Sequence, residues 1–189
     1  MAPRLNIVIG STRPGRLGPS IANWFDGFAR EHGAFEPVLV DLADFELPVY
    51  DEANHPRLRQ YTHEHTRRWS ASVEAGDAYV FVTPEYNYFA PPSLVNAIDY
   101  VLHEWAYKPA GILSYGGASG GMRSAQMLKL LLTSVKVMPI PESVNVAAFR
   151  QFIGEDGIFR PNELLSGAAR TMLDELSRWT QALLPMRSK

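Results

Sequence analysis

Two patterns of apolar and polar residues alternate along this chain. Short, almost wholly apolar runs of β-prone residues indicate strands buried in a parallel sheet, whereas apolar residues three and four positions apart indicate helices packed on it. The first pattern predicts five strands, at residues 4–10, 35–40, 79–82, 110–114 and around 135–146. The second predicts helices that follow Pro19, Leu58, Pro92, Gly121 and Asn162. This alternation specifies an α/β fold, a doubly wound parallel sheet with helices on both faces.

The most informative stretch runs from Ala78 to Tyr100. Its strand leads into a polar and aromatic loop at residues 83–88, and after Pro92 helical spacing continues through Leu94, Val95, Ile98, Val101 and Leu102. A loop at the carboxyl end of a parallel strand is where open α/β sheets bind ligands. The tyrosine rings of this loop, with Glu85 and Asn87, suit a planar heteroaromatic ligand. The alternative is a tight strand-to-helix turn whose aromatic rings only cover the end of the sheet.

A second candidate site follows the first strand, in a loop of glycines and arginines at residues 10–18. Backbone N–H groups and the dipole of the next helix favour an anion there. The glycine spacing is not the dinucleotide fingerprint, and Arg16-Leu17 replace the Lys-Ser/Thr of a nucleotide-triphosphate loop. Ser11, Thr12, Arg13 and Arg16 instead suit a phosphate monoester, because each charge-assisted hydrogen bond contributes about 1.5–3 kcal/mol. The alternative is that both arginines are solvated loop residues.

A third loop, residues 115–121, contains four glycines that permit close backbone approach to a ligand. In the strand order 2-1-3-4-5 the loops after strands one, three and four are neighbours, so we expect the first loop to face residues 84–88 across one crevice. We interpret Asp41 as an ordinary acid at a strand end. Three histidines are expected at the surface rather than on a metal, and these are His55, His63 and His65.

Composition narrows the function further. The 189 residues suit a single domain spanning 1–189, and a formal charge of −2 argues against a nucleic-acid partner. No apolar run is long enough to span a bilayer, and no signal-peptide core precedes the first strand, so we expect no membrane association. The chain contains no cysteine, which excludes disulfides and thiolate chemistry and makes a cytoplasmic location the simplest expectation.

Three motifs together resemble a known family. They are Gly10-Ser11-Thr12-Arg13, then Pro84-Glu85-Tyr86-Asn87 running on to Asn96-Ala97-Ile98-Asp99, and Ser114-Tyr115-Gly116-Gly117. In this order they resemble the NADPH-dependent FMN reductases of the flavodoxin superfamily, and Pro-Glu-Tyr-Asn is the most specific element. The resemblance implies a flavodoxin-like three-layer sandwich in strand order 2-1-3-4-5. It also implies FMN as cofactor, NADPH or NADH as co-substrate, and a homodimer or homotetramer.

The resemblance also implies a role for each motif. Ser11, Arg13 and Arg16 would hold the FMN phosphate, with Leu17 and Gly18 in the same loop. The isoalloxazine would be lined by Pro84, Glu85, Tyr86 and Asn87. The other edge of the ring would be covered by Ser114, Gly116 and Gly117, with Tyr115 between them. Many members have a small or hydroxylated residue shortly after the asparagine, where this chain has the bulkier Tyr88-Phe89.

The implied activity is that of an oxidoreductase in which the cofactor does the chemistry. A nicotinamide would pass hydride to the flavin, and the electrons would then pass to a flavin, quinone, azo or metal-oxyanion acceptor in a ping-pong cycle. No side chain need act as acid, base or nucleophile. Two alternatives are a flavodoxin-type electron carrier, which is usually more acidic than −2, and a non-catalytic phosphate-ligand-binding α/β domain.

Self-association is also expected from an aromatic run between Tyr86 and Tyr107. It contains Tyr86, Tyr88, Phe89, Tyr100, Trp105 and Tyr107. One helix and its flanks are expected to turn only part of this surface onto their own sheet, which would leave an apolar patch for a second copy to bury.

Overall fold

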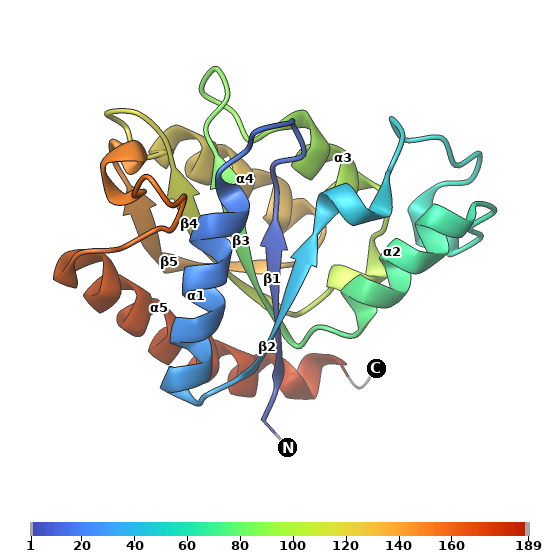
Figure 1. The fold of residues 1–189 in the computed structure, drawn as a ribbon. Helices are drawn as coiled ribbons and strands as arrows, with labels where there is room; N and C mark the ends of the chain where they lie inside the picture. Colours follow the sequence, from blue (N-terminus) through green and yellow to red (C-terminus); the bar gives the residue numbers. More distant parts are fainter. Residues whose placement is uncertain (1, 188–189) are drawn as a thin grey trace.

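The computed structural model describes residues 2–187, and its centre is a five-stranded parallel sheet (Figure 1). The strands are β1 (Arg4–Ile9), β2 (Glu36–Asp41), β3 (Ala78–Pro84), β4 (Pro109–Tyr115) and β5 (Met138–Val146). Their order in space is β2-β1-β3-β4-β5, which confirms the predicted flavodoxin-like order. The carboxyl ends of all five strands therefore lie at one edge of the sheet, where the predicted site loops begin.

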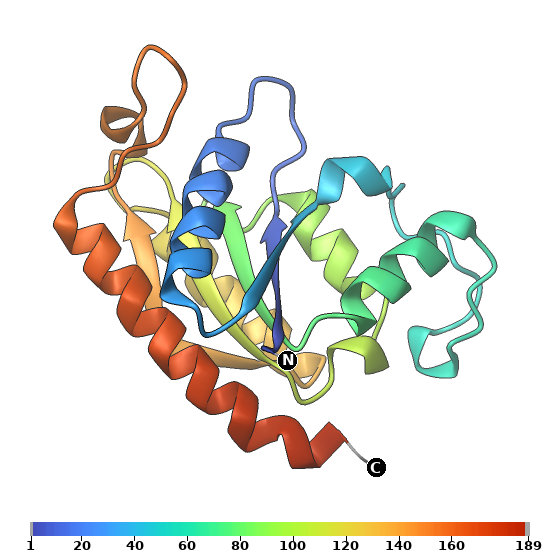
Figure 2. The same ribbon diagram turned by 60° about the horizontal axis from the view of Figure 1, so that its bottom comes forward.

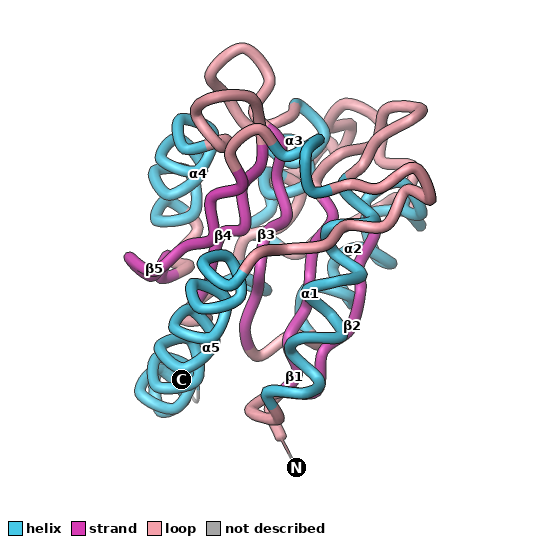
Figure 3. The backbone as a smooth tube through the Cα atoms, turned by 60° about the vertical axis from the view of Figure 1, so that its left-hand side comes forward, coloured by secondary structure: helices cyan, strands magenta, loops and turns pink. Residues whose placement is uncertain are grey.

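Five helices cover the sheet in two layers (Figures 1 and 3). They are α1 (Gly18–His32), α2 (Glu64–Glu74), α3 (Pro92–Asp99), α4 (Met122–Ser134) and α5 (Glu163–Leu183). α1 and α5 pack on one face, and α2, α3 and α4 pack on the other. In the view of Figure 2, α5 lies along one side of the molecule and reaches the C-terminal end. Among the described residues, no helix combines the length and apolarity that a membrane crossing requires.

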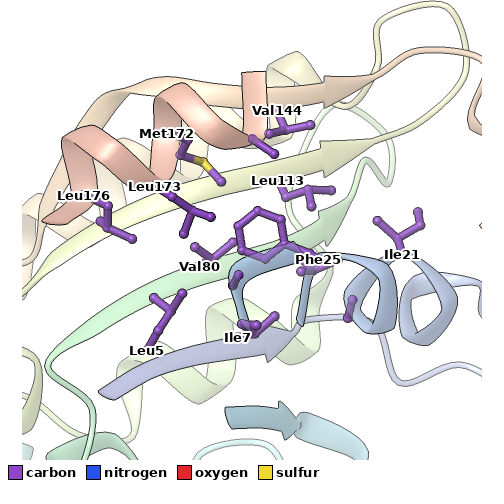
Figure 4. Close-up of a cluster of buried hydrophobic side chains, with 14 of the residues drawn as sticks. Leu5, Ile7, Ile21, Phe25, Val80, Leu113, Val144, Met172, Leu173 and Leu176 are labelled. Atoms are coloured by element: carbon purple, nitrogen blue, oxygen red, sulfur yellow. The ribbon is translucent and has the colours of Figure 1, made fainter. Parts of the chain in front are cut away.

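The core on the α1 and α5 face follows the helical spacing of the sequence (Figure 4). Phe25 of α1 and Leu173 of α5 are fully buried over Ile7 and Val80. Burial of each such side chain stabilises the fold by about 1.5–3 kcal/mol. Gly33 is the C-cap of α1, and the Asn162 side chain caps the start of α5 by accepting a hydrogen bond from the amide of Leu165.

The opposite core is rich in aromatic residues and corrects the expected end of one helix. Tyr100 and Trp105 are fully buried whereas Tyr88 and Phe89 are exposed, so only part of the run from Tyr86 to Tyr107 packs on its own sheet, as the sequence led us to expect. α3 ends at Asp99 instead of continuing through Leu102. The reason is tertiary: the Trp69 indole N–H donates to Ala97 O at 2.7 Å and the Trp105 indole to Ile98 O at 3.2 Å. Those carbonyls would otherwise accept the next two helical N–H groups.

Several boundaries also differ from the sequence pattern. α2 starts at Glu64, so Leu58 and Tyr61 lie outside it and Leu58 is half exposed. Short 3-10 helices occur outside the predicted elements, at Leu42–Phe45, Pro56–Leu58, His103–Trp105, Phe149–Phe152 and Leu184–Arg187. β5 tolerates Pro139 and Pro141 because it is an edge strand with a register shift opposite Ala110/Ile112.

Candidate functional site

A cleft of about 180 Å³ lies where the loops after β1, β3 and β4 converge. Nine of the thirteen predicted site residues line it, and they are Arg13, Arg16, Leu17, Pro84, Glu85, Tyr86, Tyr115, Gly116 and Gly117. The three loops lie together at the upper edge of the sheet in Figure 1. Residues of the loop after β1 and of the loop after β3 thus line the same cleft, as expected for two loops that face each other across one crevice.

The loop after β1 offers hydrogen-bond donors at one end of this cleft. In the described part of the chain, the amides of Ser11, Thr12 and Arg13 donate no hydrogen bond. α1 begins at Gly18, directly beyond this loop; its N-terminus has no side-chain cap and no acidic residue in its first turn. Unpaired N–H groups and the positive end of a helix dipole favour a bound anion.

The two arginines of this loop have different partners. Arg13 is exposed, and its Nε donates to the Tyr86 hydroxyl at 3.1 Å, across the cleft. Arg16 is paired with Asp41: Nη1 and Nη2 lie 2.6 and 2.7 Å from the two carboxylate oxygens. The hydrogen bonds to Asp41 outweigh desolvation and raise the pKa of Arg16. The strand-end acid Asp41 therefore has a specific structural partner that the sequence pattern did not reveal.

Glu85 lines the cleft, but its carboxylate is directed toward the start of α4. The Arg123 guanidinium contacts Oε1 at 2.6 and 2.7 Å, while Oε2 accepts from Ser119 Oγ at 3.0 Å and from the Arg123 amide at 3.2 Å. Burial raises the pKa of Glu85, but these hydrogen bonds outweigh it and the net shift is downward. Glu85 thus ties the loop after β3 to the loop after β4.

Asn87 occupies the tip of a tight turn and does not line the cleft. Tyr86 and Phe89 exchange two backbone hydrogen bonds of 2.9 and 3.0 Å, and between them Asn87 and Tyr88 have φ angles of 50° and 74°. A large residue rarely adopts a positive φ, so this turn is strained at Tyr88. The Tyr88 ring stacks against the Arg123 guanidinium at 3.9 Å, which holds the turn from outside.

Ser11, Gly18 and Ser114 lie behind the cleft wall. The buried Ser11 hydroxyl lies 3.3 Å from the hydroxyl of Tyr115, whose pKa burial raises to about 12. Gly18 packs against the same two hydroxyl groups. Ser114 Oγ donates to Gly120 O at 2.8 Å and accepts from Asn145 at 2.9 Å, so it supports the glycine loop from beneath.

Sequence reasoning missed two residues that complete the wall, Phe149 and Arg150. The Phe149 ring lies 5.2 Å from the Tyr115 ring, and Arg150 forms no ion pair with any described residue. A signal was available, because residues 147–150 follow the carboxyl end of β5, the strand next to β4. That segment carries no glycine motif, so the loop patterns of the sequence do not mark it.

A larger hollow lies elsewhere, a cavity of about 920 Å³ beneath the amino ends of the strands. It includes Asp77 and Lys108, directly before β3 and β4, and Lys136, two residues before β5. Lys108 there donates to the carbonyls of Val73 and Glu74, at the C-terminal end of α2. The charge of Lys108 is therefore used at the C-terminus of a helix, whereas the smaller cleft collects free donors at the carboxyl end of the strands, where doubly wound sheets bind ligands.

Comparison with known proteins identifies the family. A family model described as NADPH-dependent FMN reductase matches residues 3–151. The chain belongs to this family. The expected resemblance is confirmed, together with the oxidoreductase class, the FMN cofactor and the nicotinamide co-substrate that characterise the family.

Individual relatives agree with this membership. An NAD(P)H-dependent FMN reductase of Schizosaccharomyces pombe is 40% identical over 129 residues, which are 67% of this chain and 64% of that protein. A quinone reductase of Pseudomonas putida strain KT2440 is 30% identical over 145 residues, 72% of this chain and 74% of that protein. Among solved structures, the flavoenzyme FerB of Paracoccus denitrificans matches in fold with a TM-score of 0.74 at 22% identity, covering 96% and 98% of the two chains.

The cleft fits the cofactor of the NADPH-dependent FMN reductase family. Free amides beside Arg13 suit the phosphate, and the proline, tyrosine and glycine residues suit a flat ring. A Cβ added to Gly117 would meet no atom within 4 Å, so this position leaves room for a ligand. The volume is below the roughly 300–1,000 Å³ of typical small-molecule sites, so the cleft would enclose only part of the cofactor. Among the described residues, no cluster of acids and histidines is placed to bind a metal ion.

Proposed function

We propose that this protein is an FMN-dependent NAD(P)H oxidoreductase with a ping-pong cycle. The observation that carries the proposal is the cleft itself, which combines an anion-binding loop at one end with tyrosines and glycines at the other. Bound FMN would supply the redox chemistry, two-electron transfer from a reduced nicotinamide to an acceptor. We infer that the acceptor is a small molecule such as a flavin, a quinone, an azo compound or a metal oxyanion.

The chain's own residues would bind and orient the reactants. Arg13 and the amides of residues 11–13 would hold the phosphate, while Pro84, Tyr86 and the backbone at Gly116 and Gly117 would position the ring. Backbone N–H groups near the ring would stabilise the negative charge that develops on it. Tyr115 stays protonated at neutral pH, since burial raises its pKa to about 12, and it contributes a neutral hydroxyl beside Ser11.

A spectroscopic experiment tests this function. Flavin-free protein is mixed with FMN or with riboflavin, and binding is followed by quenching of flavin fluorescence. We expect FMN to bind at least ten-fold more tightly than riboflavin, and Arg13→Ala to remove much of this preference, because one charge-assisted hydrogen bond contributes about 1.5–3 kcal/mol. Equal binding of FMN and riboflavin to the wild type would contradict the phosphate assignment.

Steady-state kinetics tests the cycle. If nicotinamide and acceptor use one place in turn, double-reciprocal plots at several acceptor concentrations are parallel. Intersecting lines would show that both substrates bind at once. NADPH and NADH are compared in the same assay, with rapid bleaching of the flavin absorbance as the direct readout of the first half-reaction.

Two alternative functions would use the same cleft. A flavodoxin-type electron carrier would bind FMN but would not be reduced rapidly by either nicotinamide, and a phosphate-binding domain would leave both flavins unbound. No observation favours either function over the oxidoreductase.

We also propose that the chain self-associates as a dimer or tetramer. The support is an apolar surface next to the cleft, which we call the α4 surface: the exposed Tyr88, Phe89, Met122 and Leu130. Arg123 joins its two parts, since it follows Met122 on α4 and stacks on Tyr88. This surface includes the exposed part of the aromatic run, Tyr88 and Phe89.

A further inference from the structure

Arg16, which lines the cleft, and Asp41 form one rigid unit. Asp41 is the last residue of β2 and Arg16 lies in the loop after β1, yet their planar groups meet in a bidentate pair of 2.6 and 2.7 Å. Both side chains are only 19% exposed. Asp41 Oδ1 also accepts from the Ala43 amide at 3.0 Å, so the carboxylate is itself held in place.

Arg16 also closes the loop on itself. Its Nη1 donates to the carbonyl of Ser11 at 2.6 Å, a bond that joins the first and the sixth residue of the segment 11–16. The amides of Ser11, Thr12 and Arg13 lie within this closed segment and donate no hydrogen bond among the described residues. Their directions therefore depend on the bonds that Arg16 makes at the back of the loop.

The two arginines of the loop differ in whether an acidic residue neutralises their charge. The positive charge of Arg16 is matched by Asp41 at contact distance, so an anion in the cleft gains little attraction from it. Arg13 has no acidic partner among the described residues and reaches across the cleft to Tyr86. A bidentate arginine pair is moreover fixed in its geometry and costly to break.

We propose that Arg16 and Asp41 are positioning residues, which fix the shape of the phosphate-binding loop through their ion pair, and that of the two arginines in this loop Arg13 supplies the charge for the phosphate. This inference rests on the proposed function, because it takes the loop to be the phosphate site of FMN. It replaces the expectation that Arg16 contacts the phosphate directly. The same reasoning gives Asp41 a role in cofactor binding, although its carboxylate repels the phosphate at longer range.

A positioning role and a phosphate-binding role for Arg16 predict opposite effects of Asp41→Asn on FMN affinity. Arg16→Gln removes a positive charge and Asp41→Asn removes a negative charge. If both residues act on loop geometry, Arg16→Gln and Asp41→Asn each weaken FMN binding by about five-fold or more. The double variant then binds FMN no more weakly than the single variant with the lower affinity. If Arg16 binds the phosphate, Asp41→Asn releases it and strengthens FMN binding while Arg16→Gln weakens it. Opposite signs, or unchanged affinity in Asp41→Asn, would overturn the proposal.

The matched control is Asp44→Asn. Asp44 is exposed, lies three residues from Asp41 and makes no side-chain hydrogen bond to Arg16. It removes the same charge from the same region, so we expect FMN affinity within two-fold of the wild type. Far-UV circular dichroism and the unfolding temperature confirm that each variant is folded, and Asp41→Glu serves as a second variant if Asp41→Asn is not.

A measurement without flavin separates this inference from the proposed function. Hydrogen exchange of the segment 10–18 in flavin-free protein should be at least several-fold faster in Arg16→Gln and Asp41→Asn, and unchanged in Asp44→Asn. If wild-type protein does not bind FMN, the proposed function fails while the exchange result still reports the role of the pair. Unchanged exchange in both pair variants would overturn the positioning role itself.

Discussion

At the scale of single residues, two glycines of the loop after β4 differ in why they lack a side chain. Gly121 has a φ of 78°, and a Cβ there would lie 2.7 Å from the Tyr115 backbone nitrogen, so the position admits no side chain. Gly117 has an ordinary φ and faces open space at the cleft. Gly121 is thus required by the fold, whereas Gly117 leaves open space at the proposed site.

Alanine at these two positions should therefore give opposite results. Gly121→Ala should lower the free energy of unfolding by about 2–4 kcal/mol, since strain at a positive φ adds to a backbone clash. Gly117→Ala should leave stability within about 0.5 kcal/mol but weaken FMN, because its methyl group enters the space where the ring would lie. Urea unfolding and flavin titration of both variants check this. A Gly117→Ala protein with wild-type FMN affinity would contradict the placement of the ring.

At the scale of elements, α2 is capped from a distant segment. His63 precedes the helix without a side-chain cap, and the buried Glu52 accepts hydrogen bonds from the amides of Thr62 and His63 and from the Thr62 hydroxyl, at 2.7–3.1 Å. Burial raises the pKa of Glu52, but these hydrogen bonds outweigh it and lower the pKa to about 2. The carboxylate anchors the long segment between β2 and α2.

This cap should make stability depend on pH in a defined direction. Because the pKa of Glu52 is lower in the folded state than its ordinary value of 4.5, the stabilisation is complete above about pH 5 and is lost as the pH falls toward 2. Glu52→Gln should lower the free energy of unfolding at pH 7 by about 1–3 kcal/mol and flatten this part of the pH profile. Urea unfolding at pH 7 and pH 3 checks it.

Glu64→Gln is the control for this prediction, since Glu64 is in the first turn of the same helix but is largely exposed. Exposed pairs of this kind contribute about 0–1 kcal/mol, so its profile should follow the wild type. If Glu52→Gln retained the full wild-type pH dependence, Glu52 would not be the titrating cap.

At the scale of the whole molecule, the α4 surface lies beside the cofactor cleft. Buried Val101 is unsuitable as an interface probe, because a charge there would disrupt the core. Leu130 is 67% exposed on the outer face of α4, and Leu164 on α5 is 79% exposed and serves as a control. The two positions allow an interface effect to be separated from the general effect of a surface charge.

We expect wild-type protein to scatter light as a dimer or larger assembly. Leu130→Glu should give a monomer with unchanged circular dichroism, because burying an unpaired charge in an interface is strongly unfavourable. Leu164→Glu should keep the wild-type mass. A wild-type protein that is monomeric at micromolar concentration and fully loaded with FMN would rule out self-association through this surface.

The alternation of apolar runs and helical spacing was enough to predict the parallel sheet, the layers and the edge where the candidate site lies, whereas the strand order came from the resemblance to flavodoxin-like FMN reductases. These features follow from the local periodicity of consecutive residues together with general rules for how parallel sheets are built and where they bind ligands. The loop motifs likewise identified nine residues of the cleft, because each motif is contiguous.

Only the tertiary structure decided which groups meet. Arg16 pairs with Asp41, 25 positions away, and Glu85 pairs with Arg123, 38 positions away. Glu52 caps α2 through residues 10 and 11 positions further along the chain. The same holds for the end of α3, where two tryptophan N–H groups occupy the carbonyls that would have continued the helix. Such contacts depend on how separate elements pack against each other, and no periodicity along the chain encodes that geometry.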